Sequence, residues 1–351
     1  MEIEQILRRA VDCGASDIFV TAGLPLTFKV KGEQLREGPS YTPADSGAFA
    51  AALYRLAGRE AGCVEGGRMD DDFSCSLSNV GRFRVNLFRQ RGSLAAVVRV
   101  IRFGLPDPEA LHIPPEIMAV KDCKKGLVLV TGQAGSGKTT TLACIVDAIN
   151  HSRTGHILTL EDPVEYIHRH DRCIVNQREI QCDCPSYAAA LRSALRESPD
   201  VILLGEMRDR ETMEVAMSAA ETGQLLLSTL HTIGAANTID RIIDSFPPNQ
   251  QSQIRLQLSM VLQTVISQQM VPGKNGEPIP VFEIMHMNLA IRNLIRESKT
   301  HQIDSAIAAS AVQGMRTMDM ALLELWSKGR ITKETALTYC TNLEVMRKKL
   351  P

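Results

Sequence analysis

The sequence predicts an α/β protein with two domains, a small α+β domain followed by a larger domain built on a mainly parallel sheet. The chain has 351 residues, more than one average domain needs. Alternating apolar and polar residues predict strands in the first hundred residues, whereas continuous apolar runs separated by helical patterns follow later. A stretch rich in glycine and proline separates the two parts. We therefore expect domains at 1–102 and 119–351, joined by a linker at 103–118.

The first domain combines helices with antiparallel strands. Its opening helix has apolar residues with helical spacing at Ile3, Ile6, Leu7, Ala10 and Val11. Two strands are predicted at 17–21 and 26–30, and a second helix at 43–56. A hairpin follows, because apolar residues alternate with polar ones over 82–87 and a second apolar run covers 95–102.

The second domain has the pattern of an α/β sheet with crossover connections. Short apolar runs predict buried strands at 127–130, 157–160, 201–204 and 225–227. A helix is predicted between the first two, from the stripe Leu142, Ile145, Val146 and Ile149. From about residue 248 the chain is predicted to be mainly helical. One of these helices is marked by Ile254, Leu258, Val261, Leu262 and Val265.

Composition and charge exclude several classes of protein. The 39 Lys and Arg residues balance 40 Asp and Glu residues, and aromatic residues make up only 4%, so a dedicated nucleic-acid binder is not indicated. No apolar run approaches the roughly 18 residues of a membrane-spanning helix, so any membrane role is expected to be peripheral. The nine cysteines are scattered, which favours free thiols and a cytoplasmic location.

One motif carries the predicted chemistry. Residues 132–139 match the phosphate-binding pattern G-x-x-x-x-G-K-[ST], directly after an apolar strand and directly before a helix. The alternative is a glycine-rich turn with a solvated lysine. Glycines let backbone N–H groups surround phosphate oxygens, Lys138 reaches the terminal phosphates, and the Thr139 hydroxyl is a ligand for Mg²⁺. The residues expected to bind nucleotide are Gly132, Gly135, Ser136, Gly137, Lys138, Thr139 and Thr140.

Carboxylates follow two of the predicted strands. The strand at 157–160 leads into the acidic segment 161–165, and the strand at 201–204 leads into 205–209. Ligands of open α/β sheets lie at the carboxyl ends of the strands. These acidic side chains are therefore predicted to lie near the bound phosphates, where hydrolysis needs a held metal and an oriented water. The alternative is that they are only solvated.

With these segments, nearly the whole chain resembles the type IV pilus retraction ATPases, the PilT-like branch of the secretion-type ring ATPases. The family's boxes match residues 132–140, 159–165, 195–209 and 220–241. A signature typical of retraction motors matches Ala290, Ile291, Arg292, Asn293, Leu294, Ile295, Arg296 and Glu297. The resemblance implies a PAS-like N-terminal domain and a RecA-like P-loop ATPase domain with a helical C-terminal part.

The resemblance also implies roles for particular residues. Glu165 would polarise the attacking water, Glu206 would hold the Mg²⁺ shell, and His231 would sense the γ-phosphate region. Arg82 and Arg84, on one face of their strand, are candidates to reach the nucleotide of a neighbouring subunit, with a solvated strand face as the alternative.

Further candidates are less specific. Arg192, Arg196 and Gln224 are candidate phosphate-sensing residues, although surface arginines are often only solvated. Gln224 stands where the family usually has a histidine, and a glutamine cannot titrate near neutral pH. In the signature at 290–297, spacing alone indicates a buried helix stripe, whereas the resemblance implies a surface that couples the ring to retraction.

The function implied by the resemblance is that of a hexameric motor that hydrolyses ATP with Mg²⁺ and retracts type IV pili in twitching motility. The expected partners are further copies of the chain, an inner-membrane platform protein and a second retraction ATPase, and nucleic acid is not among them. The motor is expected in the cytoplasm, peripheral to the inner membrane. An accessory ATPase paralogue, a nucleic-acid translocase and a nucleotide-binding scaffold without turnover are the alternatives.

Overall fold

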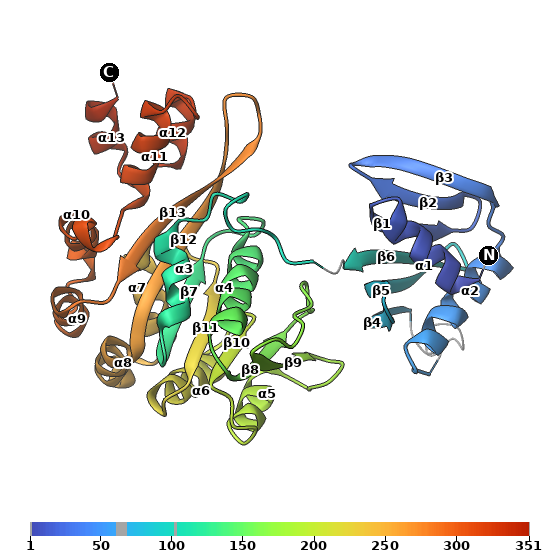
Figure 1. Cartoon of the computed structure of the whole chain (residues 1–351), viewed down its shortest axis with the longest axis horizontal. Helices are drawn as coiled ribbons and strands as arrows, with labels where there is room; N and C mark the ends of the chain where they lie inside the picture. Colours follow the sequence, from blue (N-terminus) through green and yellow to red (C-terminus); the bar gives the residue numbers. More distant parts are fainter. Residues whose placement is uncertain (1, 61–68, 102–103, 351) are drawn as a thin grey trace. The chain divides into compact units, whose positions relative to one another are not determined.

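The computed structural model describes residues 2–60, 69–101 and 104–350, and the chain forms two compact units (Figure 1). The first unit comprises Met1–Gly104 with Glu165–Ile167, and the second comprises Leu105–Val164 with His168–Pro351. The stretch from Leu105 onward, expected to be part of a linker, thus lies in the second unit. Among the described residues, none of the helices combines the length and the apolar character that crossing a bilayer requires.

The first unit is an antiparallel sheet with two helices. Its elements are α1 Ile3–Asp12, β1 Ala15–Thr21, β2 Pro25–Val30, β3 Glu33–Ser40, α2 Pro43–Leu56, β4 Asp70–Leu77, β5 Gly81–Gln90 and β6 Ser93–Ile101. The strand order is β3-β2-β1-β6-β5-β4. The predicted helices and the hairpin are confirmed. The strands β3 and β4 were not predicted from the sequence, and β3 is an exposed edge strand with little apolar patterning.

The core of the first unit lies between one face of the sheet and the two helices. Ile6 and Leu7 of α1 are buried together with Phe83 and Val85 of β5. The period of two along β5 places the alternate residues of that strand on the opposite face. The predicted alternation over 82–87 is therefore confirmed.

The second unit is an α/β sheet with helices on both faces. Its elements up to the last predicted strand are α3 Pro115–Met118, β7 Gly126–Thr131, α4 Lys138–Ser152, β8 Gly155–Glu161, β9 Cys173–Glu179, α5 Tyr187–Ala194, β10 Val201–Leu204, α6 Arg210–Glu221 and β11 Leu225–Leu230. The remaining elements are α7 Ala235–Asp244, α8 Pro248–Val261, β12 Leu262–Pro272, β13 Pro278–His286, α9 Leu289–Arg296, α10 Ile303–Ala309, α11 Met318–Ser327, α12 Lys333–Tyr339 and α13 Leu343–Lys349.

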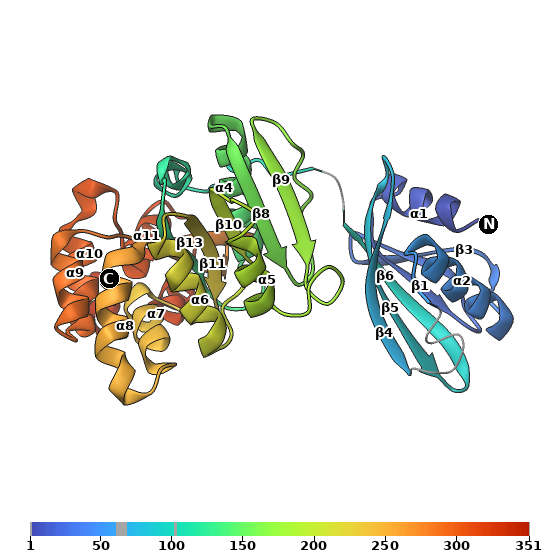
Figure 2. The ribbon, with the colours of Figure 1, turned by 90° about the horizontal axis from the view of Figure 1, so that it is seen from below.

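The sheet of the second unit has the order β13-β12-β7-β11-β10-β8-β9. Only the pair β12–β13 is antiparallel among the strand pairs in the described part of this unit. Leu127 and Leu129 of β7 are buried with residues of α5–α8 on one side of the sheet, and Val128 and Val130 are buried with residues of α3 and α4 on the other. Figure 2 shows α4 and the group α5, α6 and α8 on opposite sides of the sheet. Burial on both faces explains why these strands have continuous apolar runs.

The chain after residue 248 differs from the helical prediction. The helix α8 ends at Val261, and Leu262 and Val265 belong to β12, which pairs with β7 in the centre of the sheet. The prediction of one helix from Ile254 to Val265 was therefore wrong. The apolar residues continue at helical spacing across the junction, but here the same spacing belongs to a helix followed by a strand that is buried on both faces.

Candidate nucleotide-binding and catalytic site

The P-loop connects the end of β7 to the start of α4. Gly132, Gly135 and Gly137 have φ angles of 146°, 78° and 88°, a region that favours glycine. A Cβ atom on Gly132 would lie 2.1 Å from the carbonyl oxygen of Gln268 on β12. The glycines of the motif are therefore required both by the backbone conformation and by close packing against the neighbouring strand.

Lys138 lies at the first position of α4, directly after the loop. Its side chain is buried, and its Nζ atom donates hydrogen bonds to the carbonyl oxygens of Gly132 and Gln133, each at 2.9 Å. A phosphate oxygen is a stronger, charged acceptor for this ammonium group. The amino end of α4 adds a partial positive charge at the same place. This end of the sheet is therefore suited to a phosphate chain.

Two hydroxyl groups are buried at the same loop. Thr131 ends β7 and Ser136 lies inside the P-loop, and neither hydroxyl has a hydrogen-bond partner among the described residues. Leaving such a group unsatisfied costs about 1–3 kcal/mol. A phosphate oxygen beside the P-loop would satisfy the Ser136 hydroxyl, so this buried group fits a bound anion.

The structure brings Glu206 and His231 together. β10 and β11 are parallel neighbours with Leu204 opposite Ser228, so the residues that follow both strands meet at one edge of the sheet. The Nε2 atom of His231 lies 3.3 Å from Oε2 of Glu206, and the guanidinium of Arg208 lies 2.5 Å from Oε1. Glu206 is nearly buried while the other two side chains are exposed.

Arg208 was not predicted as a site residue. The carboxylate of Glu206 raises the pKa of the Arg208 guanidinium through a hydrogen bond and charge attraction. The signal in the sequence was the position of Arg208 in the segment 205–209, two residues after Glu206. The guanidinium adds a positive charge at the edge where phosphate would bind.

Glu165 lies in the loop after β8 and is exposed. The preceding residue, Val164, donates its N–H to the carboxylate of the buried Glu179 at 3.2 Å, which holds this part of the loop. Glu161, the first residue of the predicted acidic segment, ends β8 and is buried, and its carboxylate accepts a hydrogen bond from Thr159 at 2.6 Å. Its signal was a carboxylate placed directly at the end of an apolar strand.

The donor set at the P-loop fits Mg²⁺. The hydroxyl of Thr139 in the first turn of α4 and the carboxylate of Glu206 after β10 are oxygen ligands, the kind that Mg²⁺ prefers. Mg²⁺ usually keeps several waters and binds one or two protein oxygens together with substrate phosphates. Two such side chains beside a P-loop therefore suffice for this ion.

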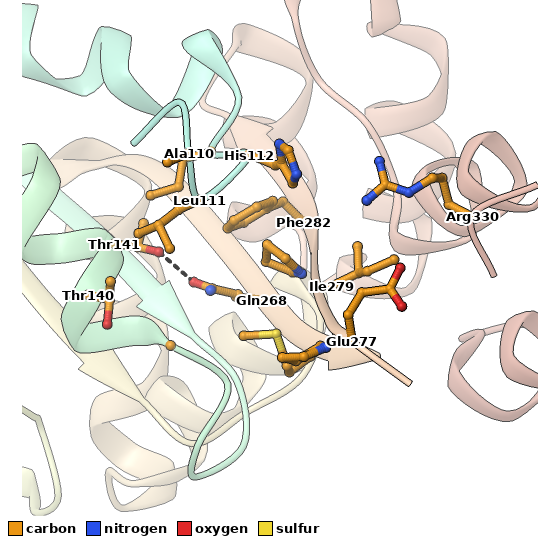
Figure 3. A pocket seen from close by; sticks show the side chains of 15 residues that line it. Ala110, Leu111, His112, Thr140, Thr141, Gln268, Glu277, Ile279, Phe282 and Arg330 are labelled. Atoms are coloured by element: carbon orange, nitrogen blue, oxygen red, sulfur yellow. Dashed lines mark hydrogen bonds between the residues drawn. The ribbon is translucent and has the colours of Figure 1, made fainter. Parts of the chain in front are cut away.

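A cavity of about 300 Å³ adjoins the P-loop (Figure 3). Leu111 and Phe282 give it apolar walls, Arg330 lies at the far side, and Gln268 accepts a hydrogen bond from the Thr141 hydroxyl at 2.8 Å. The residues that line it are Ala110, Leu111, His112, Ile113, Gly137, Thr140, Thr141, Gln268, Met270, Glu277, Pro278, Ile279, Pro280, Phe282 and Arg330. Such a cavity suits the flat apolar faces of a nucleobase.

Gln224 lies at the amino end of β11. β11 runs parallel to β7 with Leu230 opposite Thr131, and Gln224 precedes β11, where its carbonyl accepts the N–H of Gly126 at 2.9 Å. Its side chain accepts a hydrogen bond from Thr222 at 2.8 Å. The length of β11 puts Gln224 about 20 Å from the P-loop edge. This distance separates Gln224 from a nucleotide held by the P-loop of the same chain, and its role as a phosphate-sensing residue remains a prediction.

The other two phosphate-sensing candidates have partners on the helix surface. Arg192 of α5 pairs with Glu211 of α6 at 2.7 Å, and Arg196 donates to the carbonyl oxygen of Arg192 at 3.4 Å. Both helices cover the sheet face opposite α4. Their role toward phosphate remains a prediction.

The arginines of the first unit lie where alternation placed them. Arg82 and Arg84 are half-buried on the face of β5 opposite Phe83 and Val85. Arg82 also donates to the Ser76 hydroxyl at 3.5 Å on the neighbouring strand. Their orientation is confirmed, while their role toward a neighbouring subunit remains a prediction.

The segment 290–297 forms most of α9. Ile291 and Ile295 are fully buried, as the helix stripe predicted. Arg292 donates to the carbonyl oxygen of Ser259 at the end of α8, and Arg296 donates to the Ser259 hydroxyl at 2.9 Å. Both arginines of the signature thus bind the end of α8.

These features can be compared with known proteins. The model of the family described as Type II/IV secretion system protein matches residues 2–277 of the chain. The chain belongs to the Type II/IV secretion system protein family. Within that family it is a PilT-like ATPase: it is 44% identical over 336 residues to the "Type IV pilus retractation ATPase PilT" of Pseudomonas aeruginosa, covering 96% of this chain and 97% of that protein.

Two further comparisons agree with this family assignment. The "Type IV pilus ATPase PilU" of Pseudomonas aeruginosa is 37% identical over 348 residues, covering 99% of this chain and 91% of that protein. The crystal structure of the pilus retraction motor PilT with bound ADP superimposes with a TM-score of 0.89 and 42% identity, covering 99% of both chains. The predicted fold of an N-terminal PAS-like domain and a C-terminal RecA-like ATPase domain is thereby confirmed, and use of a nucleotide follows.

Proposed function

We propose that this secretion-family ATPase is a hexameric motor that retracts type IV pili and thereby drives pilus disassembly and twitching motility. The similarity to pilus retraction ATPases over nearly the whole chain supports this proposal and favours the motor over a nucleic-acid translocase. The observation that carries it is a single edge of one sheet, where the P-loop with Lys138 adjoins the pair Glu206 and His231.

The residues divide the work of ATP hydrolysis among them. Backbone N–H groups of 132–139 and the ammonium of Lys138 bind the phosphate chain. Mg²⁺, held by Thr139 and Glu206, would neutralise charge on the terminal phosphates. Glu165 takes a proton from water as the water oxygen bonds to the γ-phosphorus and the bond to the departing ADP oxygen breaks, while His231 lies at the γ-phosphate end.

The nucleobase occupies the cavity beside the P-loop. Gly137, Thr140 and Thr141 belong both to the P-loop region and to the wall of this cavity, so a nucleotide with its phosphates at Lys138 can place its base there. Leu111 and Phe282 contact the faces of the base, which stabilises binding through apolar burial.

Assembly completes the proposed motor. Six copies form a ring at the cytoplasmic side of the inner membrane, where an inner-membrane platform protein receives the force and a second retraction ATPase assists. Arg82 and Arg84 reach the nucleotide of the neighbouring copy, and α9 takes part in coupling to retraction. The first unit moves against the second during the cycle.

Turnover tests the chemistry. Lys138→Ala removes the phosphate-binding ammonium and is expected to abolish phosphate release from ATP with Mg²⁺. Glu165→Ala is expected to retain ATP binding but to lose at least a hundredfold in turnover, in line with loss of a general base. Lys328→Ala, at the exposed residue that directly follows α11, is the matched control. Wild-type turnover in Glu165→Ala would show that Glu165 does not activate the water.

Retraction is tested in cells. Strains in which Lys138→Ala replaces the chromosomal copy are expected to carry long pili that do not retract and to lose twitching, whereas Lys328→Ala strains behave as wild type. Unchanged pili and motility would contradict a role as the retraction motor and favour an accessory ATPase.

A further inference from the structure

Glu283 is a buried carboxylate in the middle of β13 that contacts two helices. Its side chain is 2% exposed. Oε1 accepts a hydrogen bond from the backbone N–H of Ala235 at 2.6 Å, and Oε2 accepts one from the N–H of Met318 at 3.2 Å. Ala235 is the first residue of α7 and Met318 is the first residue of α11. One carboxylate therefore holds the amino ends of two helices that are far apart in the sequence.

The first of these helices begins at the catalytic edge of the sheet. The start of α7 follows His231 by only four residues. Next to the Glu283 contact, the N–H of Gly234 donates to the Ser267 hydroxyl on β12 at 2.8 Å. Ser267 precedes Gln268, whose carbonyl oxygen lies against Gly132 of the P-loop. Two acceptors on adjacent strands thus fix the loop that carries His231.

The second helix begins the C-terminal helical group α11–α13. α11 packs on β13, with Met318 and Leu322 buried against Val281. Just before it, the backbones of Arg316 and Ile284 exchange hydrogen bonds at 2.8 and 3.0 Å. The start of α11 is therefore attached to the same strand that carries Glu283.

The pKa of the Glu283 carboxylate depends on its burial and on its two hydrogen-bond partners. Burial raises the pKa of Glu283 to about 7, and the backbone N–H groups of Ala235 and Met318 oppose this rise. The carboxylates of Asp304 and Asp319 are the charged groups that act on it, and both raise the pKa further. The ionised side chain accepts both hydrogen bonds at once, so a movement at one helix changes the interaction at the other.

We propose that Glu283 is a positioning residue that couples the loop of His231 to the C-terminal helices α11–α13, so that a change at the nucleotide is transmitted to these helices. The role of His231 in this coupling rests on the proposed function. The connection itself consists of hydrogen bonds between the described residues, from the start of α7 through Glu283 to the start of α11.

Hydrogen exchange of the full chain tests the coupling, with and without adenylyl imidodiphosphate and Mg²⁺. In the wild type, nucleotide is expected to slow exchange at least threefold in peptides covering 232–238 and 318–323. Glu283→Gln keeps one acceptor oxygen for Ala235 but presents an amide N–H₂ to Met318. In this variant, nucleotide is expected to slow exchange at 232–238 as in the wild type, whereas the slowing at 318–323 falls below 1.5-fold. Glu324→Gln on α11 is the control.

A second arm needs no nucleotide and separates this inference from the proposed function. Ser267→Ala removes the acceptor of Gly234 and is expected to speed exchange at 318–323 when Glu283 is present but not in the double variant with Glu283→Gln. Equal effects in both backgrounds overturn the coupling, whatever the ATPase activity. If the purified wild-type chain showed no ATP turnover but the variants gave the expected exchange pattern, the proposed motor function would be contradicted and the coupling would stand.

A variant that leaves the Glu283 side chain in place covers the case in which Glu283→Gln does not fold. Met318→Pro removes the donated N–H at the first helical position, where proline is accepted, after a Thr317 that is already extended. In Met318→Pro, as in Glu283→Gln, nucleotide is expected to slow exchange at 318–323 by less than 1.5-fold. A wild-type response in Met318→Pro would overturn the proposal.

Discussion

The two ends of β11 have different contacts, although both belong to the single segment 220–241 of the sequence. At the carboxyl end, His231 contacts Glu206 at the edge where the P-loop begins. At the amino end, Gln224 accepts hydrogen bonds from the Thr222 hydroxyl and from the backbone N–H of Gly126. A strand rises about 3.3 Å per residue, so the two ends lie about 20 Å apart. Two residues of one short sequence motif therefore need not belong to the same functional site.

The difference has a general physical cause. In a parallel sheet, the carboxyl ends of the strands collect the loops that bind ligands, because crossover helices return the chain to the other edge. The predicted catalytic residues Glu165, Glu206 and His231 all follow the carboxyl ends of strands, whereas the amino ends of β7 and β11 are joined by the hydrogen bond from Gly126 to Gln224. Substitutions at the two edges should therefore have effects of very different size.

The largest effect is expected at the carboxyl edge. Glu206→Gln keeps the shape of the side chain but removes the charge that faces His231 and Arg208. Turnover is expected to fall by roughly a hundredfold or more, as is typical for loss of one group that stabilises developing charge. Phosphate release with Mg²⁺ measures it, with the exposed Glu214→Gln on α6 as control. Turnover within threefold of the wild type would show that the charge of Glu206 is not needed to hold Mg²⁺.

A smaller effect is expected on stability, where substitutions at two glycines of the P-loop should differ. Ala at Gly132 would place its Cβ 2.1 Å from the Gln268 carbonyl oxygen, whereas Ala at Gly135 meets nothing within 4 Å. Both positions have positive φ, which costs about 1–2 kcal/mol for a side chain. Thermal unfolding should show Gly132→Ala as the less stable variant by a further 2 kcal/mol or so, because the backbone must shift. Equal melting temperatures would show that the contact with β12 does not constrain the loop.

The sequence predicted the parts of the site whose chemistry is local. The P-loop follows from glycines and Lys138 at fixed spacing between a strand and a helix, and the strand at Val201–Leu204 was predicted with its observed bounds. Glu206 was placed correctly at a strand end, because an apolar run followed by a carboxylate is a local pattern. Such features depend on neighbours in the chain, which the sequence displays directly.

Other parts depend on contacts between distant segments and could not be predicted. The cavity beside the P-loop joins Leu111, Thr141, Phe282 and Arg330, which come together only after folding. The strand β12 was taken for a helix, since apolar residues continue at helical spacing from α8. Only its neighbours in the sheet decide its conformation, because a short apolar run fits a buried helix and a buried strand alike.

The smallest effect is expected at the amino edge of β11. Gln224→His restores the residue usual in the family, and its imidazole lies far from the P-loop of its own chain. Turnover of the assembled protein is expected to stay within twofold of the wild type, and loss of the hydrogen bond from Thr222 costs about 0.5–1.5 kcal/mol of stability. His231→Gln, the matched change at the other end, is expected to reduce turnover at least tenfold, which phosphate release measures. If Gln224→His changed turnover as much as His231→Gln, the position would act across a subunit boundary, since the strand separates it from the phosphates of its own chain.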